Sequence, residues 1–186
     1  MSPQSSPSQG GQIFIDESKA KDYLLVGAII QPTELAAARK AACKLILPGQ
    51  YRVHMFKESE QRKKIILASI SAIGAEVLIY RADKTQGTET LRRTWCLDSL
   101  VDDALAERRA EIILELDSST VRQDQSEILR KLKSVGAENR LAYRHATAAS
   151  EPLLLIPDAI GWAWARGGDW RKRVSSLVSV HNVRSN

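Results

Sequence analysis

Acidic residues follow two predicted strands of this sequence, at the point where each strand ends. Asp16 closes an apolar strand at residues 12–18, and Asp117 closes another at residues 111–118. Ligands of open α/β sheets bind at the carboxyl ends of the strands, where two adjacent carboxylates would repel each other. Because Mg²⁺ prefers carboxylate oxygens, the pattern predicts a Mg²⁺ or Mn²⁺ site held by these acids.

A third acid, Asp158, lies inside the apolar segment LLLIPDAIGWAWA. A charge on the apolar face of a helix is unfavourable unless it is paired or bound to a metal. Gly161 would let this helix approach the sheet closely and bring Asp158 toward the strand ends. The alternative is that Asp158 only stabilises the first turn of a helix that begins at Pro157.

The neighbours of these acids are expected to support the site rather than to form it. Side chains alternate along a strand, so Glu115 shares a face with Asp117. We expect Glu17, Ser18 and Glu115 to surround the metal ligands without binding the metal. Asp117 has an alternative role of its own, because an aspartate after a strand often forms a turn or caps the next helix.

The hydrophobic patterns predict one α/β domain over residues 12–186, preceded by a flexible tail at residues 1–11. Apolar or alternating segments predict strands, whereas apolar residues three or four positions apart predict helices. The predicted strands are residues 12–18, 23–30, 76–82, 111–118 and 141–148. The predicted helices are residues 33–47, 58–72, 89–108, 120–136, a helix from about 157, and 169–178.

The composition fits a globular protein, with 44% hydrophobic and 26% charged residues among 186. No apolar run reaches the roughly 18 residues that cross a bilayer, and the start of the chain lacks the features of a signal peptide. We therefore expect a cytoplasmic protein with no membrane partner, in which Cys43 and Cys96 are reduced core thiols. The net charge of +5 permits a polyanionic partner without requiring one.

Five segments together resemble a known family. They are FIDES, the apolar strand YLLVGAII, the lone His54, ELDSS, and PDAIGWAWA. Over residues 13–166 they are similar to the uncharacterised ribonuclease H-like family called domain of unknown function 3800. Two positions depart from that family, because Lys19 stands where it often has glycine and Pro157 where it often has alanine.

The resemblance implies a ribonuclease H-like α/β fold with a five-stranded mixed sheet, three antiparallel strands followed by two parallel ones. Helices flank this sheet, and residues 33–72 form a helical insertion after the second strand. It also implies an acidic metal site formed by Asp16, Asp117 and Asp158. His54 matches a histidine that the family often places after the second strand.

The function expected from these features is metal-dependent hydrolysis of phosphodiester bonds in DNA or RNA. Two Mg²⁺ or Mn²⁺ ions about 4 Å apart would activate water and stabilise the leaving oxygen. Asp16 would bridge the ions, and Asp117 and Asp158 would each hold one of them. His54 would contact a phosphate or assist the leaving group, and its alternative is a purely structural histidine.

Basic residues near the end of the chain are candidates for binding nucleic acid, since arginine neutralises phosphate and tryptophan stacks on bases. The alternative is a solvated basic face with the tryptophans in the core. The basic residues are Arg166, Arg171, Lys172 and Arg173, and they alternate with Trp162, Trp164 and Trp170.

The main rival function is a non-catalytic module that binds nucleic acid or protein on the same fold. Three carboxylates within about 6 Å of one another would favour a metal site, whereas acids held in caps or salt bridges would favour the rival. The chain contains no Gly-rich nucleotide-binding motif, so no nucleotide cofactor is expected. It also lacks Gly-x-Ser-x-Gly, which disfavours a serine hydrolase. The sequence does not indicate an oligomeric state.

Overall fold

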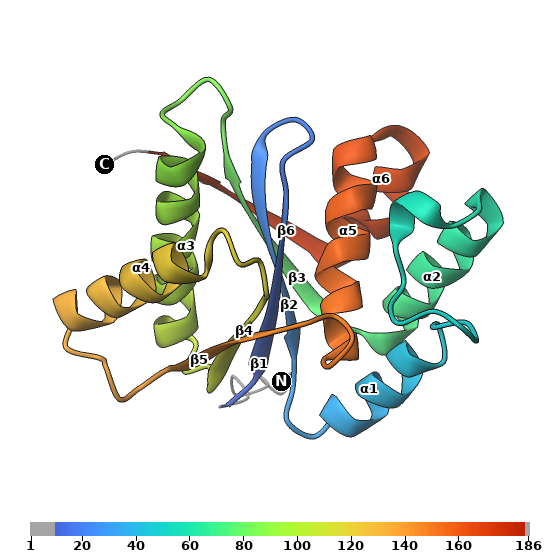
Figure 1. Ribbon diagram of the computed structural model, residues 1–186, viewed down its shortest axis with the longest axis horizontal. Helices are drawn as coiled ribbons and strands as arrows, with labels where there is room; N and C mark the ends of the chain where they lie inside the picture. Colours follow the sequence, from blue (N-terminus) through green and yellow to red (C-terminus); the bar gives the residue numbers. More distant parts are fainter. Residues whose placement is uncertain (1–9, 185–186) are drawn as a thin grey trace, which may run out of the picture.

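The fold is built on a six-stranded sheet with the order β5-β4-β1-β2-β3-β6 (Figure 1). The computed structural model describes residues 10–184, so most of the predicted tail lies outside the described residues. The strands are β1 (Gln12–Ser18), β2 (Tyr23–Ile30), β3 (Glu76–Ala82), β4 (Glu111–Glu115), β5 (Ala142–Ala146) and β6 (Val178–Val183).

The predicted order of antiparallel and parallel strands is confirmed for the first five strands. The pairs β1–β2 and β2–β3 are antiparallel, whereas β4 lies parallel to β1 and β5 parallel to β4. The prediction of five strands is wrong, because β6 pairs in parallel with β3 at the far edge. The predicted helix at residues 169–178 is correspondingly shorter. Most of β6 is exposed, so its own pattern carries little of the hydrophobic signal that reveals a strand.

Helices cover both faces of the sheet in two layers (Figure 1). One layer packs against Ile13, Ile15 and Leu25, and the other against Phe14 and Val26. The first layer contains α3 (Glu89–Ala106) and α4 (Val121–Ser134). The second contains α1 (Leu35–Cys43), α2 (Glu60–Ile73), α5 (Leu155–Arg166) and α6 (Gly168–Val174). Although β1 and β2 are buried between the layers, the polar residues at the end of β1 are only partly buried.

The predicted helical insertion after the second strand is confirmed as α1 and α2. Ser59 caps the start of α2 by accepting a hydrogen bond from the Arg62 amide, and Gly74 ends it with φ of 76°. Residues 44–59 connect the two helices and include a 3₁₀ turn at Met55–Lys57. We call residues 44–59 the insertion loop.

The two cysteines differ in their surroundings. Cys96 is buried among the side chains that pack under α3, as predicted for a core thiol. Cys43 is exposed, so the prediction of a core position is wrong for that residue. It lies at the last position of the short helix α1, beyond the turns whose alanines face the core.

Close packing of α5 on the sheet depends on Gly161. A Cβ atom at this position would lie 3.3 Å from Val26 Cγ2 and 3.6 Å from Ser18 Cβ, so the glycine removes an obstacle at the point of contact. The expectation that Gly161 brings Asp158 toward the strand ends is confirmed. The helix begins at Leu155, two residues before the predicted start.

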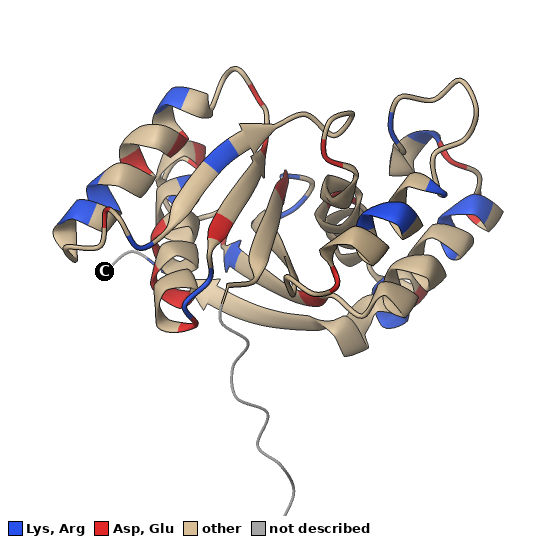
Figure 2. Ribbon diagram, turned by 90° about the horizontal axis from the view of Figure 1, so that it is seen from below, with Lys and Arg blue, Asp and Glu red and all other residues tan. Residues whose placement is uncertain are grey.

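Charged residues are distributed over the whole fold. In the described part of the chain, no helix is both long and apolar enough to cross a membrane. Basic and acidic positions are interspersed along the helices of both layers (Figure 2). The net charge therefore does not distinguish one face of the protein as a binding surface.

A buried ion-pair network joins α3, α4, β2 and β5 on the first face of the sheet. Arg93 donates from Nε to Asp124 Oδ1 at 2.6 Å, from Nη2 to Asp124 Oδ2 at 2.9 Å and from Nη1 to the Tyr23 hydroxyl at 2.7 Å. His145 Nε2 lies 2.9 Å from Asp124 Oδ2. Asp124 is completely buried, so its charge depends on these partners.

We predict that Asp124→Ala destabilises the protein by about 3–5 kcal/mol, because it leaves the buried Arg93 without its main counter-charge. Chemical denaturation followed by circular dichroism measures the change in the free energy of unfolding. The control is Arg130→Ala, which removes an exposed pair with Asp98 on the same two helices and should change stability by less than about 1 kcal/mol. Equal effects of the two substitutions would contradict the structural role of the buried pair.

Candidate functional site

Asp16, Glu115 and Asp158 converge on the α5 face of the sheet. The register of the parallel strands pairs Ile15 with Leu114, so the next residues of each strand, Asp16 and Glu115, lie side by side. Their side chains alternate with those of the preceding residues and point to the face that α5 covers. Asp158 comes from the first turn of α5. We call these three residues the carboxylate cluster.

Arg52 of the insertion loop provides positive charge to this cluster. Its guanidinium forms an ion pair with Glu115, and its Nη2 lies 3.9 Å from Asp158 Oδ2. The side chains of Arg52, Glu115 and Asp158 are each at least two-thirds buried. One arginine therefore balances part of the charge of three carboxylates.

The pKa values of two cluster members reflect this crowding. Burial raises the pKa of Asp16 well above its ordinary value, and the charges of Glu115 and Asp158 raise it further. Burial also raises the pKa of Asp158 to about 6, with Arg52 opposing the shift and Glu115 adding to it. Both carboxylates are thus held in a setting where the ionised form needs more positive charge than Arg52 supplies.

The donor atoms of the cluster fit a hard divalent cation. Glu115 Oε2 and Asp158 Oδ2 are buried and have no hydrogen-bond partner, and carboxylate oxygens are the ligands that Mg²⁺ and Mn²⁺ prefer. Within residues 10–184, however, no three His, Cys, Asp or Glu side chains are arranged as a ready metal site. The chemistry of the residues fits a cation, and Arg52 lies where it would compete with one.

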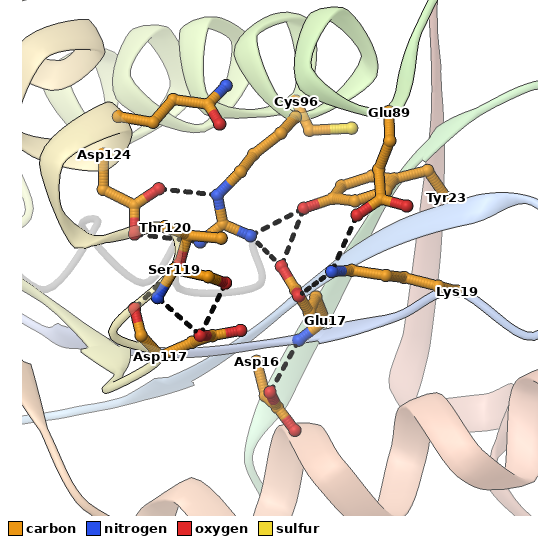
Figure 3. Close-up of polar contacts among 12 residues, drawn as sticks. Asp16, Glu17, Lys19, Tyr23, Glu89, Cys96, Asp117, Ser119, Thr120 and Asp124 are labelled. Carbon is orange, nitrogen blue, oxygen red and sulfur yellow. Dashed lines mark hydrogen bonds and ion pairs between the residues drawn. The ribbon is translucent and has the colours of Figure 1, made fainter.

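Asp117 lies outside the carboxylate cluster. The strand β4 ends at Glu115, two residues before Asp117, so the alternation that the sequence suggested does not extend that far. The Asp117 carboxylate accepts hydrogen bonds from the backbone amide and the hydroxyl of Ser119, at 2.8 and 2.7 Å (Figure 3). These bonds lower the pKa of Asp117. It forms a turn before α4 and borders a pocket of about 400 Å³ that Asp16 also lines.

Glu17 points away from the cluster, to the opposite face of β1 (Figure 3). There it pairs with Arg93 and Lys19 and accepts a hydrogen bond from the Tyr23 hydroxyl at 2.8 Å. Its own backbone amide donates to Asp16 Oδ1 at 2.8 Å. Glu17 therefore connects the end of β1 to the buried ion-pair network. Ser18, the last residue of β1, packs against Gly161.

His54 lies in the insertion loop, two residues after Arg52. Its side chain is exposed and is not part of the carboxylate cluster. Partial burial lowers the pKa of His54, and the charges of Arg52 and Lys57 lower it further. The lowered pKa favours the neutral imidazole near pH 7, which can accept a proton or donate a hydrogen bond.

The four basic residues near the end of the chain are all exposed. Arg171 donates from Nε and Nη2 to the Trp164 carbonyl at the end of α5, and Arg173 lies over the Trp170 ring at 5.9 Å. Lys172 lies 3.4 Å from Asp169. Only Arg166 borders a groove that includes Asp158. We call this the hairpin groove. It has a volume of about 710 Å³ and lies between the turn after β1 and the helices α2, α5 and α6.

Comparisons with known proteins bear on the fold alone. Neither protein-family models nor curated protein sequences give a match to this chain. A chain from the structure of the PCNA:RNase HII complex of Archaeoglobus fulgidus superposes with a TM-score of 0.55 and 10% sequence identity. The match covers 90% of this chain and 76% of that one. The fold is ribonuclease H-like. At this identity the likeness to ribonuclease HII carries no residue roles with it.

The sequence alone did not single out Glu115 as a cluster member or Arg52 as its counter-charge. A signal for Glu115 was present, because it follows Ile113 with the alternation of a strand and precedes a polar turn. Arg52 lies 63 residues from Glu115, in a loop without periodicity. No local pattern links it to the acids, so only the fold reveals the pair.

We predict that Asp158→Asn stabilises the metal-free protein at pH 7.5 and has little effect at pH 4.5. The folded pKa of about 6 exceeds the unfolded value of about 3.9. The folded state therefore loses stability as pH rises from about 4 to 6, by about 1–3 kcal/mol in total. Thermal unfolding of both proteins across this range measures the difference.

Asp117→Asn is the matched control, with the opposite sign. Its carboxylate has a lowered pKa, so its stabilising contribution is present above the unfolded pKa and disappears as pH falls through the folded value. The substitution should destabilise the protein at pH 7.5 and have less effect in acid. A stability difference for Asp158→Asn that does not vary with pH would refute the assignment of a raised pKa.

Proposed function

We propose that this protein is a metal-dependent nuclease that hydrolyses phosphodiester bonds in DNA or RNA. The observation that carries the proposal is the convergence of Asp16, Glu115 and Asp158, with two buried carboxylate oxygens that have no hydrogen-bond partner. The ribonuclease H-like fold is compatible with this function. The sequence segments that resemble the domain of unknown function 3800 family are consistent with the same proposal.

Each member of the cluster has a role that its position supports. Asp16, on the central strand β1, lies beside Glu115 and close to Asp158, and the three would hold a cation together. Bound divalent cations would supply an activated water and neutralise charge on the phosphate. Asp117, predicted from the sequence as a ligand, would remain at the border of the adjoining pocket.

Arg52 and His54 are suited to act on the phosphate rather than on the cation. A guanidinium released from Glu115 and Asp158 has the shape and charge to bind phosphate oxygens. His54, whose lowered pKa favours the neutral form, would accept a proton from a nearby water. Both residues lie in the insertion loop, so they would approach the substrate together.

A second candidate function has one observation in its favour. Arg52 already pairs with Glu115 and Asp158, as expected if the acids are structural and the arginine is their permanent partner. The protein would then bind nucleic acid or another protein without cleaving it. The two functions differ in whether a divalent cation replaces Arg52 at the cluster.

We predict that calorimetric titration of the wild-type protein shows Mn²⁺ binding, which Glu115→Gln weakens by at least about tenfold. Asp117→Asn has little effect, because that carboxylate lies outside the cluster. Both substitutions remove one negative charge from the end of β4, so they are matched in net charge. No binding to the wild type at millimolar Mn²⁺ would favour the non-catalytic function, and a larger loss in Asp117→Asn would restore Asp117 as the ligand.

We also predict that Arg52→Gln raises the affinity for Mn²⁺ by about tenfold, or about 1.4 kcal/mol, because a competing charge is removed. The same variant should unfold at a lower temperature than the wild type without metal and recover stability when Mn²⁺ is added. Lys57→Gln removes an equal charge from the same loop without touching the cluster. Unchanged affinity in Arg52→Gln, or the same gain in Lys57→Gln, would show that Arg52 does not compete with the cation.

A further inference from the structure

The hairpin groove leads directly to the carboxylate cluster, because Asp158 belongs to both. Its positive charge comes from three elements that are distant in sequence. Lys21 lies on the turn after β1, Lys63 on α2, and Arg166 at the end of α5. None of these three side chains forms an ion pair with any of residues 10–184. Lys19 and the acids Glu17, Glu60 and Asp158 line the groove as well, so it presents three cations without an ion-pair partner alongside acidic side chains.

Aromatic side chains line the groove together with these cations. Phe56 lines the groove and is 83% exposed, whereas its neighbour Met55 is 1% exposed. The 3₁₀ turn at Met55–Lys57 is thus anchored in the core while it holds a phenyl ring out in solvent. At this exposure the faces of the Phe56 ring are available to a ligand.

Two tryptophans form another part of the wall of the groove. Trp162 and Trp170 pack edge to face, with ring centroids 5.0 Å apart. Lys63 Nζ lies 5.0 Å from the centroid of the Trp162 ring, so a cation is held against an aromatic face. Both tryptophans are only partly buried. The wall combines positive charge with flat apolar surface over a short distance.

We propose that the hairpin groove binds a single strand of nucleic acid and guides it to the carboxylate cluster, with one base stacked on Phe56. This rests on the proposed nuclease function. Lys21, Lys63 and Arg166 would contact the phosphates. Positively charged grooves with exposed aromatic rings bind single strands, because unpaired bases offer faces for stacking.

The arrangement favours a single strand over a duplex and over a protein partner. The bases of a duplex are stacked on one another, so Phe56 would have no face to meet and only the phosphate contacts would remain. A protein partner would have to supply acidic side chains to three cations that have no ion-pair partner in the groove and an apolar surface to Phe56. A strand of nucleic acid satisfies both the cations and the ring.

The test is fluorescence anisotropy of the full chain, in EDTA, with a labelled 12-nucleotide DNA strand, an RNA strand of the same sequence, and the DNA duplex. The wild type should bind a single strand more tightly than the duplex. Phe56→Ala should weaken single-strand binding by about tenfold and leave duplex binding unchanged, whereas Phe56→Tyr should retain affinity. The control Leu47→Ala shortens another exposed apolar side chain of the insertion loop and should have no effect. Thermal unfolding of each variant confirms that it is folded.

The salt dependence of binding tests the cations separately. Lys21, Lys63 and Arg166 are replaced by glutamine one at a time. Each substitution should reduce the slope of log affinity against log salt concentration by about 0.7. Single-strand binding that Phe56→Ala does not weaken, or a preference for the duplex, would overturn the proposal. Failure to bind any nucleic acid would also overturn it and would leave an acidic protein segment as the occupant to examine.

These outcomes are independent of the metal. If Mn²⁺ binds the carboxylate cluster but the groove fails to bind a strand, the nuclease proposal stands and the groove proposal falls. If strands bind through Phe56 but Mn²⁺ does not bind, the groove is retained and cleavage is lost.

Discussion

The need for positive charge at the end of β1 constrains the architecture of this protein. Three carboxylates with little access to water lie on one face of the sheet, and Arg52 is the cation that reaches them. Burial raises the pKa of Asp16 and Asp158, which means that ionisation at neutral pH opposes folding. Such an arrangement persists in a protein only when the rest of the structure supplies the missing stability.

The opposite face of the same strand supplies part of that stability. Side chains alternate, so Asp16 and Glu17 leave β1 in opposite directions, and they meet two different electrostatic environments (Figure 3). Glu17 reaches Arg93, which is held by the fully buried Asp124. Glu17 is held by several partners, whereas burial and the neighbouring carboxylates disfavour the ionised form of Asp16. Glu17 also helps to position Asp16, since its backbone amide donates a hydrogen bond to Asp16 Oδ1.

The sequence revealed the elements that have their own hydrophobic pattern. The strands of the ribonuclease H-like sheet, the insertion after β2 and the close approach at Gly161 all leave local signals. The exposed edge strand β6 does not: the predicted helix at residues 169–178 reaches only its first residue, and residues 179–183 belong to no predicted element. Glu115 was placed at the edge of the site because β4 was expected to continue to Ser118, whereas it ends three residues earlier. Since the end of a strand depends on where its partners stop, it is a tertiary property that a single segment does not encode.

The insertion loop connects the electrostatics of the cluster to the proposed binding of a strand. It carries Arg52, which balances part of the charge of the carboxylates, and Phe56, which lines the hairpin groove. The buried residues Val53 and Met55 fix the segment between them. A phosphate brought in along the groove would offer Arg52 an alternative partner while adding negative charge beside the cluster. The first effect removes a positive charge that competes with a divalent cation, and the second increases the attraction of the cluster for that cation. Cation and strand would therefore bind with positive cooperativity, because each relieves the charge imbalance that the other creates.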